Sequence, residues 1–190
     1  MTFIKKNIVL ITAFALPVLL VLWIAVSTYL PSLLLSTQYN FVYATCDTGS
    51  GYYGYNCENY LTSRYGVENG KLVVREVPPT QDSDRDKVAD INENYITRLF
   101  LHDTKANEGR EITLAEAQNL NLRELLTSPD GVSVESGYNR GAEFFFLFDS
   151  SSEHHYYLTK GKKHKQLNLV NDEERYYYRE NFKFIGWVIK

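Results

Sequence analysis

Cysteine is scarce in this sequence, and what the chain lacks excludes several classes of protein. Two cysteines form at most one bridge, so the chain is not a small domain held together by several disulfides. It also has no phosphate-binding loop and no Asn-x-Ser/Thr sequon, and no Ser–His–Asp arrangement stands out. Across 190 residues no compositional class is extreme, which excludes collagen-like, coiled-coil and low-complexity chains. We expect one domain with an accessory segment, and we assign no catalytic residue.

Charge is absent from the whole stretch between Ile8 and Leu35. About 20 apolar residues are enough to cross the hydrocarbon core of a bilayer. We predict a transmembrane helix over residues 8–30, with Pro31 at its exit, followed by a juxtamembrane segment over residues 31–45. The alternative is a cleaved signal peptide, whose apolar region has only about 7–15 residues and ends at a small-residue cleavage site. The length of the stretch favours a single-pass anchor.

The basic residues beside this stretch predict its orientation. Lys5 and Lys6 precede it, and the next basic residue is Arg64. Because positive charge is retained on the cytoplasmic side, we expect a cytoplasmic stub over residues 1–7 and an extracytoplasmic domain over residues 46–190. Without the two N-terminal lysines, 18 of the 20 basic residues remain against 23 acidic ones. That balance disfavours a general binder of nucleic acid or anionic lipid, for which a basic surface is the usual footprint. The uncharged stretch makes the cell membrane the expected location.

Cys46 and Cys57 flank a stretch rich in glycine and tyrosine. In an oxidising compartment, two cysteines this close are expected to pair as a structural disulfide. No histidine lies near them to complete a zinc site. Directly after the first cysteine, Asp47-Thr48-Gly49-Ser50 matches the core of an aspartic protease site. That chemistry needs two aspartates that share a proton, so one copy would require a homodimer, and a membrane-tethered hydrolase is the enzymatic alternative.

An acidic segment has the ligand spacing of a calcium loop. Carboxylates occupy positions 1, 3, 5, 9 and 12 of the loop pattern, namely Asp82, Asp84, Asp86, Asp90 and Glu93. Calcium prefers about six to eight oxygen ligands, and the spacing resembles EF-hand and thrombospondin-type repeats. However, Lys87 occupies the sixth position, where glycine normally allows a sharp turn. The segment is therefore a calcium site of an adhesion module or a solvated acidic connector. We expect no other cofactor.

Alternating hydrophobicity and turn residues predict a mainly β domain in the form of a meander. Strands are expected at residues 71–77, 95–101, 132–135, 143–148, 155–159, 166–170 and 182–189. A capping box formed by Thr113 and Glu116 predicts one short helix that ends near Leu120. The basic residues 160–165 are expected at the tip of a hairpin, with binding to anionic polymer or lipid head groups as the alternative.

Two stretches share a pattern that runs from an apolar strand through an aspartate and a polar turn to Leu and Thr. They span Leu99–Leu114 and Phe146–Thr159, with Ser128-Pro129-Asp130-Gly131 between them. This pattern resembles the blades of WD-repeat-like β-propellers found in Tol-system periplasmic proteins. The chain is also similar to bacterial single-pass proteins that carry Ser-Pro-Asp-Gly and a terminal Phe-Ile-Gly-Trp-Val segment. The resemblance implies blade-like hairpins used for binding, although a closed propeller takes about four or more blades and only about two fit here.

Tyr176, Tyr177 and Tyr178 are candidate binding residues, because tyrosine buries its ring while its hydroxyl tolerates water. We therefore expect a membrane-anchored extracytoplasmic binding or scaffolding protein of the cell envelope, without catalysis. Its candidate partners are the membrane, other proteins or a second copy of the chain. The strand at residues 182–189 needs a neighbouring strand, which we expect within the same domain.

Overall fold

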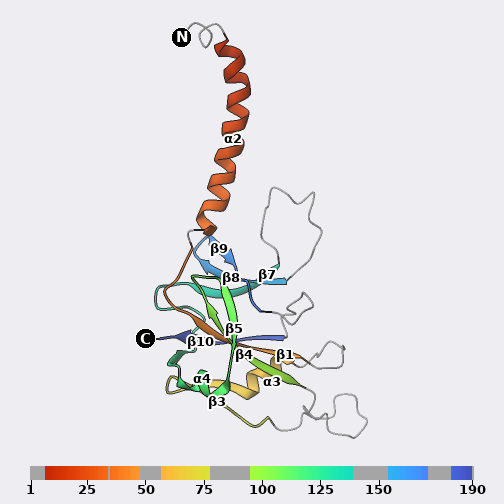
Figure 1. The fold of residues 1–190 in the computed structure, drawn as a ribbon, viewed down its shortest axis with the longest axis vertical. Coiled ribbons are helices and arrows are strands. Elements are labelled where there is room, and N and C mark those ends of the chain that lie inside the picture. Colours follow the sequence, from red (N-terminus) through yellow and green to blue (C-terminus); the bar gives the residue numbers. More distant parts are fainter. Residues whose placement is uncertain are drawn as a thin grey trace, which may run out of the picture.

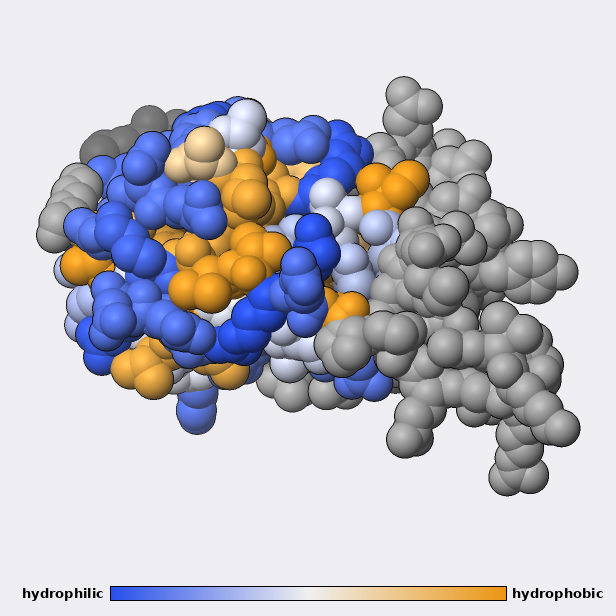
Figure 2. Space-filling model, turned by 90° about the horizontal axis from the view of Figure 1, so that it is seen from below, coloured by the Kyte–Doolittle hydropathy of each residue, from blue (hydrophilic) through white to orange (hydrophobic). Residues whose placement is uncertain are grey.

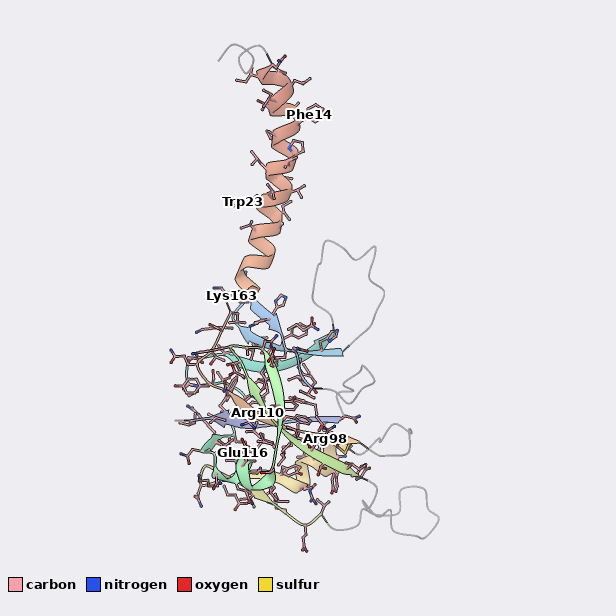
Figure 3. The ribbon with its side chains drawn as sticks, viewed as in Figure 1. Phe14, Trp23, Arg98, Arg110, Glu116 and Lys163 are labelled. Carbon is pink, nitrogen blue, oxygen red and sulfur yellow. A yellow bond between two sulfur atoms is a disulfide. The ribbon has the colours of Figure 1, made fainter. Side chains whose placement is uncertain are left out.

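A helix of 26 residues, α2 (Ile8–Leu33), projects from a β-rich body, as Figure 1 shows. The computed structural model describes residues 7–33, 35–47, 57–77, 95–138, 154–170 and 181–189. From Ile8 to Val26, the large apolar side chains of α2 are exposed, Val9 to 81% and Trp23 to 75% (Figure 3). The hydroxyls of Thr12 and Ser27 donate to backbone carbonyls of the preceding turn, so their polar groups are satisfied within the helix.

The expected helix over residues 8–30 is confirmed, but its C-terminal end was placed too early. Pro31 lies inside α2 and the helix continues to Leu33. Proline lacks one backbone N–H donor, and near the end of a helix this removes a single hydrogen bond. In the middle of the helix, Pro17 is likewise accommodated without a break.

The larger sheet has five antiparallel strands in the order β5-β4-β1-β10-β6. These strands are β1 (Phe41–Asp47), β4 (Ile96–Asp103), β5 (Glu108–Ile112), β6 (Leu122–Arg123) and β10 (Phe182–Val188). The central strand β1 begins inside the segment that we interpreted as juxtamembrane. Phe41, Val42, Tyr43 and Ala44 are all buried, so the strand has a continuous apolar run and lacks the alternation by which a strand is recognised in a sequence. Strand β10 pairs with β1 and β6, so its expected partner within the domain is confirmed.

Two helices and a hairpin cover one face of this sheet. They are α3 (Cys57–Arg64), the hairpin of β2 (Tyr65–Glu68) and β3 (Lys71–Val74), and α4 (Leu114–Asn119). Asn69 and Gly70 both have positive φ, as a two-residue hairpin turn requires. Thr113 caps α4 by accepting a hydrogen bond from the backbone N–H of Glu116, as the capping box predicts. The carboxylate of Glu116 pairs with Arg110 on β5 (Figure 3).

A three-stranded sheet covers the other face. Its strands β7 (Ser133–Tyr138), β8 (His154–Lys160) and β9 (Lys163–Gln166) follow one another as a meander. The expected strand over residues 166–170 is wrong, because β9 occupies residues 163–166 instead. Gly161 adopts a positive φ of 61°, so the turn needs only two residues and strand pairing resumes at once between Lys160 and Lys163. The strand expected at residues 143–148 lies outside the described residues.

Two hydrophobic cores result from the alternation of side chains along β1. Val42 and Ala44 face α3, α4 and the β2–β3 hairpin, in a core that includes Leu61 and Ile185. Phe41 and Tyr43 face the three-stranded sheet, in a second core of largely aromatic residues. Its other members include Phe100, Val132, Leu158 and Trp187. The described body therefore consists of three layers, with the five-stranded sheet in the middle.

Candidate functional site

The structure places only some of the expected site residues. Cys46 on β1 and Cys57 at the start of α3 form a disulfide with a Cα–Cα distance of 6.0 Å, which confirms the predicted pairing. The calcium candidates Asp82, Asp84, Asp86, Asp90 and Glu93 and the candidates Tyr176, Tyr177 and Tyr178 lie outside the described residues, as does the side chain of Asp47. Within the part of the chain that is described, no group of three or more His, Cys, Asp or Glu residues is placed to hold a metal ion.

The segment that follows α2 is fixed to the body by an aspartate. The carboxylate of Asp130 accepts hydrogen bonds from the hydroxyl of Thr37 at 2.9 Å and the backbone N–H of Gln38 at 3.3 Å. The hydroxyl of Ser128 also donates to it. Partial burial is the largest single effect on the pKa of Asp130 and raises it, but the hydrogen bonds to the charged form together outweigh burial and hold the pKa below its usual value. The Ser-Pro-Asp-Gly turn therefore has a structural role at the end of the body nearest α2, the helix-proximal end.

Positive charge gathers at the same end. Figure 3 shows Lys163 beside the last turns of α2, and β9 lies against this helix. Lys160, Lys162 and Lys163 are exposed, while His164 and Lys165 are partly exposed. The amide of Asn107 donates to the carbonyl of Gln166 at 3.1 Å, so the β4–β5 turn lies next to the end of β9.

His102 is a buried ionisable group between the two sheets. Its ring has no exposed surface and stacks on Phe41 with a centroid distance of 4.8 Å. Neither ring nitrogen has a hydrogen-bond partner among the described residues. Burial lowers the pKa of His102 to about 4, against a smaller opposing effect of the neighbouring Asp103 carboxylate. The ring is therefore neutral at physiological pH and serves as a core side chain.

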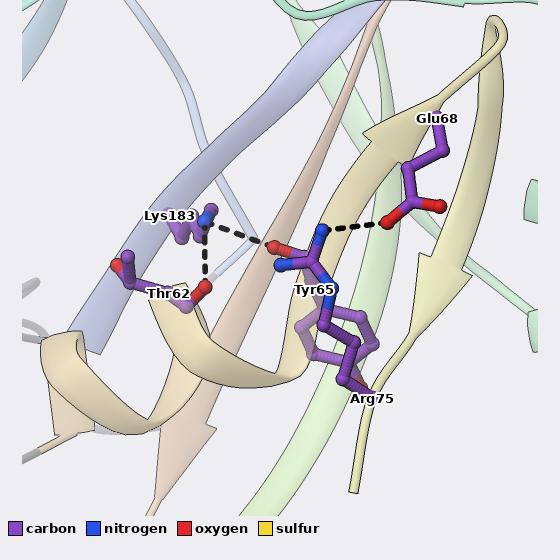
Figure 4. A network of polar contacts seen from close by, with 5 residues as sticks. All are labelled: Thr62, Tyr65, Glu68, Arg75 and Lys183. Carbon is purple, nitrogen blue, oxygen red and sulfur yellow. Dashed lines mark hydrogen bonds and ion pairs between the residues drawn. The ribbon is translucent and has the colours of Figure 1, made fainter. Parts of the chain in front are cut away.

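Lys183 is half-buried and belongs to the network of polar contacts in Figure 4. Its ammonium group donates to the carbonyls of Thr62 and Tyr65, at 3.4 and 3.0 Å. These carbonyls lie at the end of α3, where a positive charge is favourable. Burial lowers the pKa of Lys183. In the same figure, the guanidinium of Arg75 pairs with Glu68 at 2.8 Å across the β2–β3 hairpin. These contacts hold α3 and the hairpin on the sheet.

The end of the body opposite α2, the helix-distal end, has an apolar surface. β3, α3 and α4 lie there, as Figure 1 shows. Figure 2 looks at this end and shows hydrophobic residues gathered at its centre within a ring of hydrophilic ones. The elements at this end carry partly exposed Val73 and Val74 and exposed Leu114. An apolar patch with a polar rim is typical of surfaces that bind other proteins.

The sequence pattern predicts the lysine cluster but not its position beside α2, because long-range packing carries no local sequence signal. His102 and Lys183 were also missed, since a single histidine or lysine in an apolar strand does not show which partners will surround it. No family model matches the chain, and no curated protein or solved structure shows significant similarity to it.

Proposed function

We propose that the chain is a single-pass, membrane-anchored extracytoplasmic protein of the cell envelope that binds or scaffolds other proteins. The observation that carries the proposal is the exposure of the apolar part of α2. Residues Ile8–Ser27 have a mean hydropathy of 2.8, and none of that span is buried against the body. Exposing apolar surface to water costs about 25 cal/mol per Å². A lipid bilayer removes this cost, and the span has the length that a bilayer requires.

Two further features support the proposed orientation. Lys5 and Lys6 precede α2, and positive charge is retained on the cytoplasmic side. The Cys46–Cys57 disulfide belongs to the body on the other side of the helix, and such bonds persist in oxidising compartments. Both features support an extracytoplasmic location of the body.

The binding role is supported by the apolar surface at the helix-distal end. This end would face away from the bilayer, where a partner protein has free access. The β4–β5 pair and the β7–β8–β9 meander are the hairpins that we interpret as blade-like, and antiparallel sheets of this kind provide a rigid frame for such a surface.

Protease accessibility tests the location. The protein is expressed with one epitope at each terminus. Any outer membrane or cell wall is removed, and protease is added while the membrane that holds α2 is still intact. We expect loss of the C-terminal epitope and retention of the N-terminal one. Rapid alkylation of free thiols in the same cells should show that Cys46 and Cys57 are oxidised. Protection of the C-terminal epitope until the cells are permeabilised would contradict the proposal.

Site-specific photocrosslinking in native membranes tests the binding role. A photoreactive residue at Val73, on the helix-distal surface, is compared with one at Glu135, which is exposed on β7. We expect adducts of discrete mass from position 73 only, because an apolar contact there brings the partner within reach. Equal yields at both positions, or no adduct at position 73, would rule out this surface as the binding face.

A further inference from the structure

The β8–β9 hairpin holds its positive charges in an arrangement that is unfavourable by itself. Lys160 and Lys163 are direct neighbours across the strand pair, and like charges in such positions repel. Lys163 and Lys165 share one face of β9, because side chains alternate along a strand. Among the described residues, none of Lys160, Lys162, Lys163 and Lys165 forms an ion pair with a carboxylate. The ammonium of Lys160 donates instead to the backbone carbonyl of Asp130, at 2.7 Å. An external anion would offset this repulsion.

The position of the hairpin along α2 indicates where that anion lies. At about 1.5 Å per residue, the first 20 residues of α2, counted from Ile8 beside the N-terminal lysines, are about 30 Å long, which matches the hydrocarbon core of a bilayer. The rest of α2, up to Leu33, then reaches about 9 Å further, into the layer of lipid head groups. Strand β9 lies against α2, and Lys163 is beside its last turns (Figure 3). Lys163, and Lys160 paired with it across the hairpin, are thus at the level of the head groups.

Hydrogen bonds keep the hairpin at this level. Asp130 accepts from Thr37 and Gln38, which follow α2, and its carbonyl accepts from Lys160 on β8. The chain that leaves the helix and the hairpin are therefore joined through the same residue. This connection prevents the hairpin from turning away from the bilayer without breaking several contacts.

We propose that the β8–β9 hairpin binds the phosphate groups of anionic phospholipids in the bilayer that holds α2, and thereby seats the body on the membrane surface. This inference rests on the membrane anchor of the proposed function and adds a lipid class to it. Lysines near an anionic surface gain a favourable interaction within a Debye length. Binding of lipid phosphates offsets the repulsion between Lys160 and Lys163 and explains why β9 lies beside the end of α2.

Lysine acetylation in nanodiscs tests the proposal with the full-length chain. The protein is reconstituted in phosphatidylcholine, with or without phosphatidylglycerol, and the acetylation rate of each lysine is measured by mass spectrometry. We expect acetylation of Lys162 and Lys163 to slow by about fivefold in the anionic discs and to recover at high salt. Lys71, on β3 at the helix-distal end, is the internal control and should react equally in both discs.

A matched pair of variants shows whether the lysines act together. In Lys162→Gln/Lys163→Gln, the lipid protection of Lys160 and Lys165 should weaken, whereas Lys71→Gln should leave it unchanged. Equal rates in both lipids, or protection that appears only with a soluble polyanion or an acidic protein, would overturn the proposal. An alkaline wash of the neutral discs distinguishes failure of the lipid site from failure of the membrane anchor. Retained chain with equal rates refutes the lipid site alone, whereas chain lost in the wash refutes the anchor and the lipid site together.

Discussion

Single residues show how this fold uses ionisable groups. His102 lies between the sheets with its ring on Phe41, and burial lowers its pKa to about 4. Its ordinary pKa of about 6.5 applies when the chain is unfolded. The unfolded chain therefore binds a proton more readily than the folded one. The titration of His102 consequently does not change the stability above about pH 6.5, and protonation of the ring favours unfolding as the pH falls from there towards 4.

We predict that His102→Phe makes the protein less sensitive to acid. Phenylalanine keeps a ring against Phe41 and removes the group that must be protonated on unfolding. The free energy of unfolding of the variant, relative to the original, should rise by up to about 3 kcal/mol between about pH 7 and pH 4. Urea denaturation of the full chain in detergent at both pH values measures this difference.

Carboxylates also contribute to the pH dependence of stability, so the comparison with the original chain is the control. The pKa values of Asp103, Glu111, Glu116 and Asp130 are lowered, so their contributions are also lost as the pH falls. Glu111, Glu116 and Asp130 are the same in both chains and cancel in the difference. Asp103 cancels only in part, because His102 contributes to its lowered pKa. Identical pH dependence of the two proteins would show that the buried ring does not titrate as the structure indicates.

At the scale of the elements, the packing of β10 depends on the close approach of its backbone at Gly186 to the backbone of β6. Gly186 lies opposite β6, and a Cβ atom built on it would be 2.9 Å from the carbonyl oxygen of Arg123. The obstacle is backbone, which has no rotamer to change. β6 has only two residues, so a small displacement removes its pairing with Trp187 and Val188.

We therefore predict that Gly186→Ala lowers the free energy of unfolding by about 1–3 kcal/mol. Gly137→Ala on β7 is the matched control, because nothing lies within 4 Å of the position of its added Cβ. That variant should change stability by no more than about 0.5 kcal/mol. Urea denaturation of both variants provides the comparison, and an equal loss in the two would show that strand propensity, not the contact with Arg123, decides the effect.

At the scale of the whole molecule, Asp130 connects the end of the helix to the body. Its carboxylate receives hydrogen bonds from Thr37, Gln38 and Ser128, and the hydroxyl of Thr104 donates nearby to the carbonyls of Thr37 and Tyr39. The segment between α2 and β1 is thereby held against the turn before β7. The orientation of the body relative to α2 follows from these contacts.

We predict that Asp130→Ala loosens this connection and costs about 1–3 kcal/mol, because buried donors lose their acceptor. Hydrogen–deuterium exchange should accelerate at the backbone amides of Gln38 and Tyr39 while the centre of β1 stays protected. Asp103→Ala is the control, since Asp103 is exposed and, among the described residues, its carboxylate accepts hydrogen bonds from the local backbone of Lys105 and Ala106. Acceleration of the same size in both variants would argue against a specific role of Asp130.

The amino-acid sequence by itself determined the features that depend on neighbouring residues. The uncharged stretch from Ile8 predicted α2, and Thr113 with Glu116 predicted the start of α4. The short separation of Cys46 and Cys57 predicted their disulfide, and strong local β patterns predicted β3, β4, β7, β8 and β10 to within a few residues. In each case the physical cause is local: the solvation of apolar side chains, a cap on the first turn, or a turn of few residues.

Only the tertiary structure decided which distant segments meet. It placed β1 at the centre of the sheet between β4 and β10, although its apolar run follows α2 directly. It also placed β9 within the lysine cluster instead of after it. That cluster lies against α2, which is more than a hundred residues earlier in the chain. Such pairings depend on the summed burial of many side chains from both partners. The sequence of one segment does not show which distant segment will pack against it.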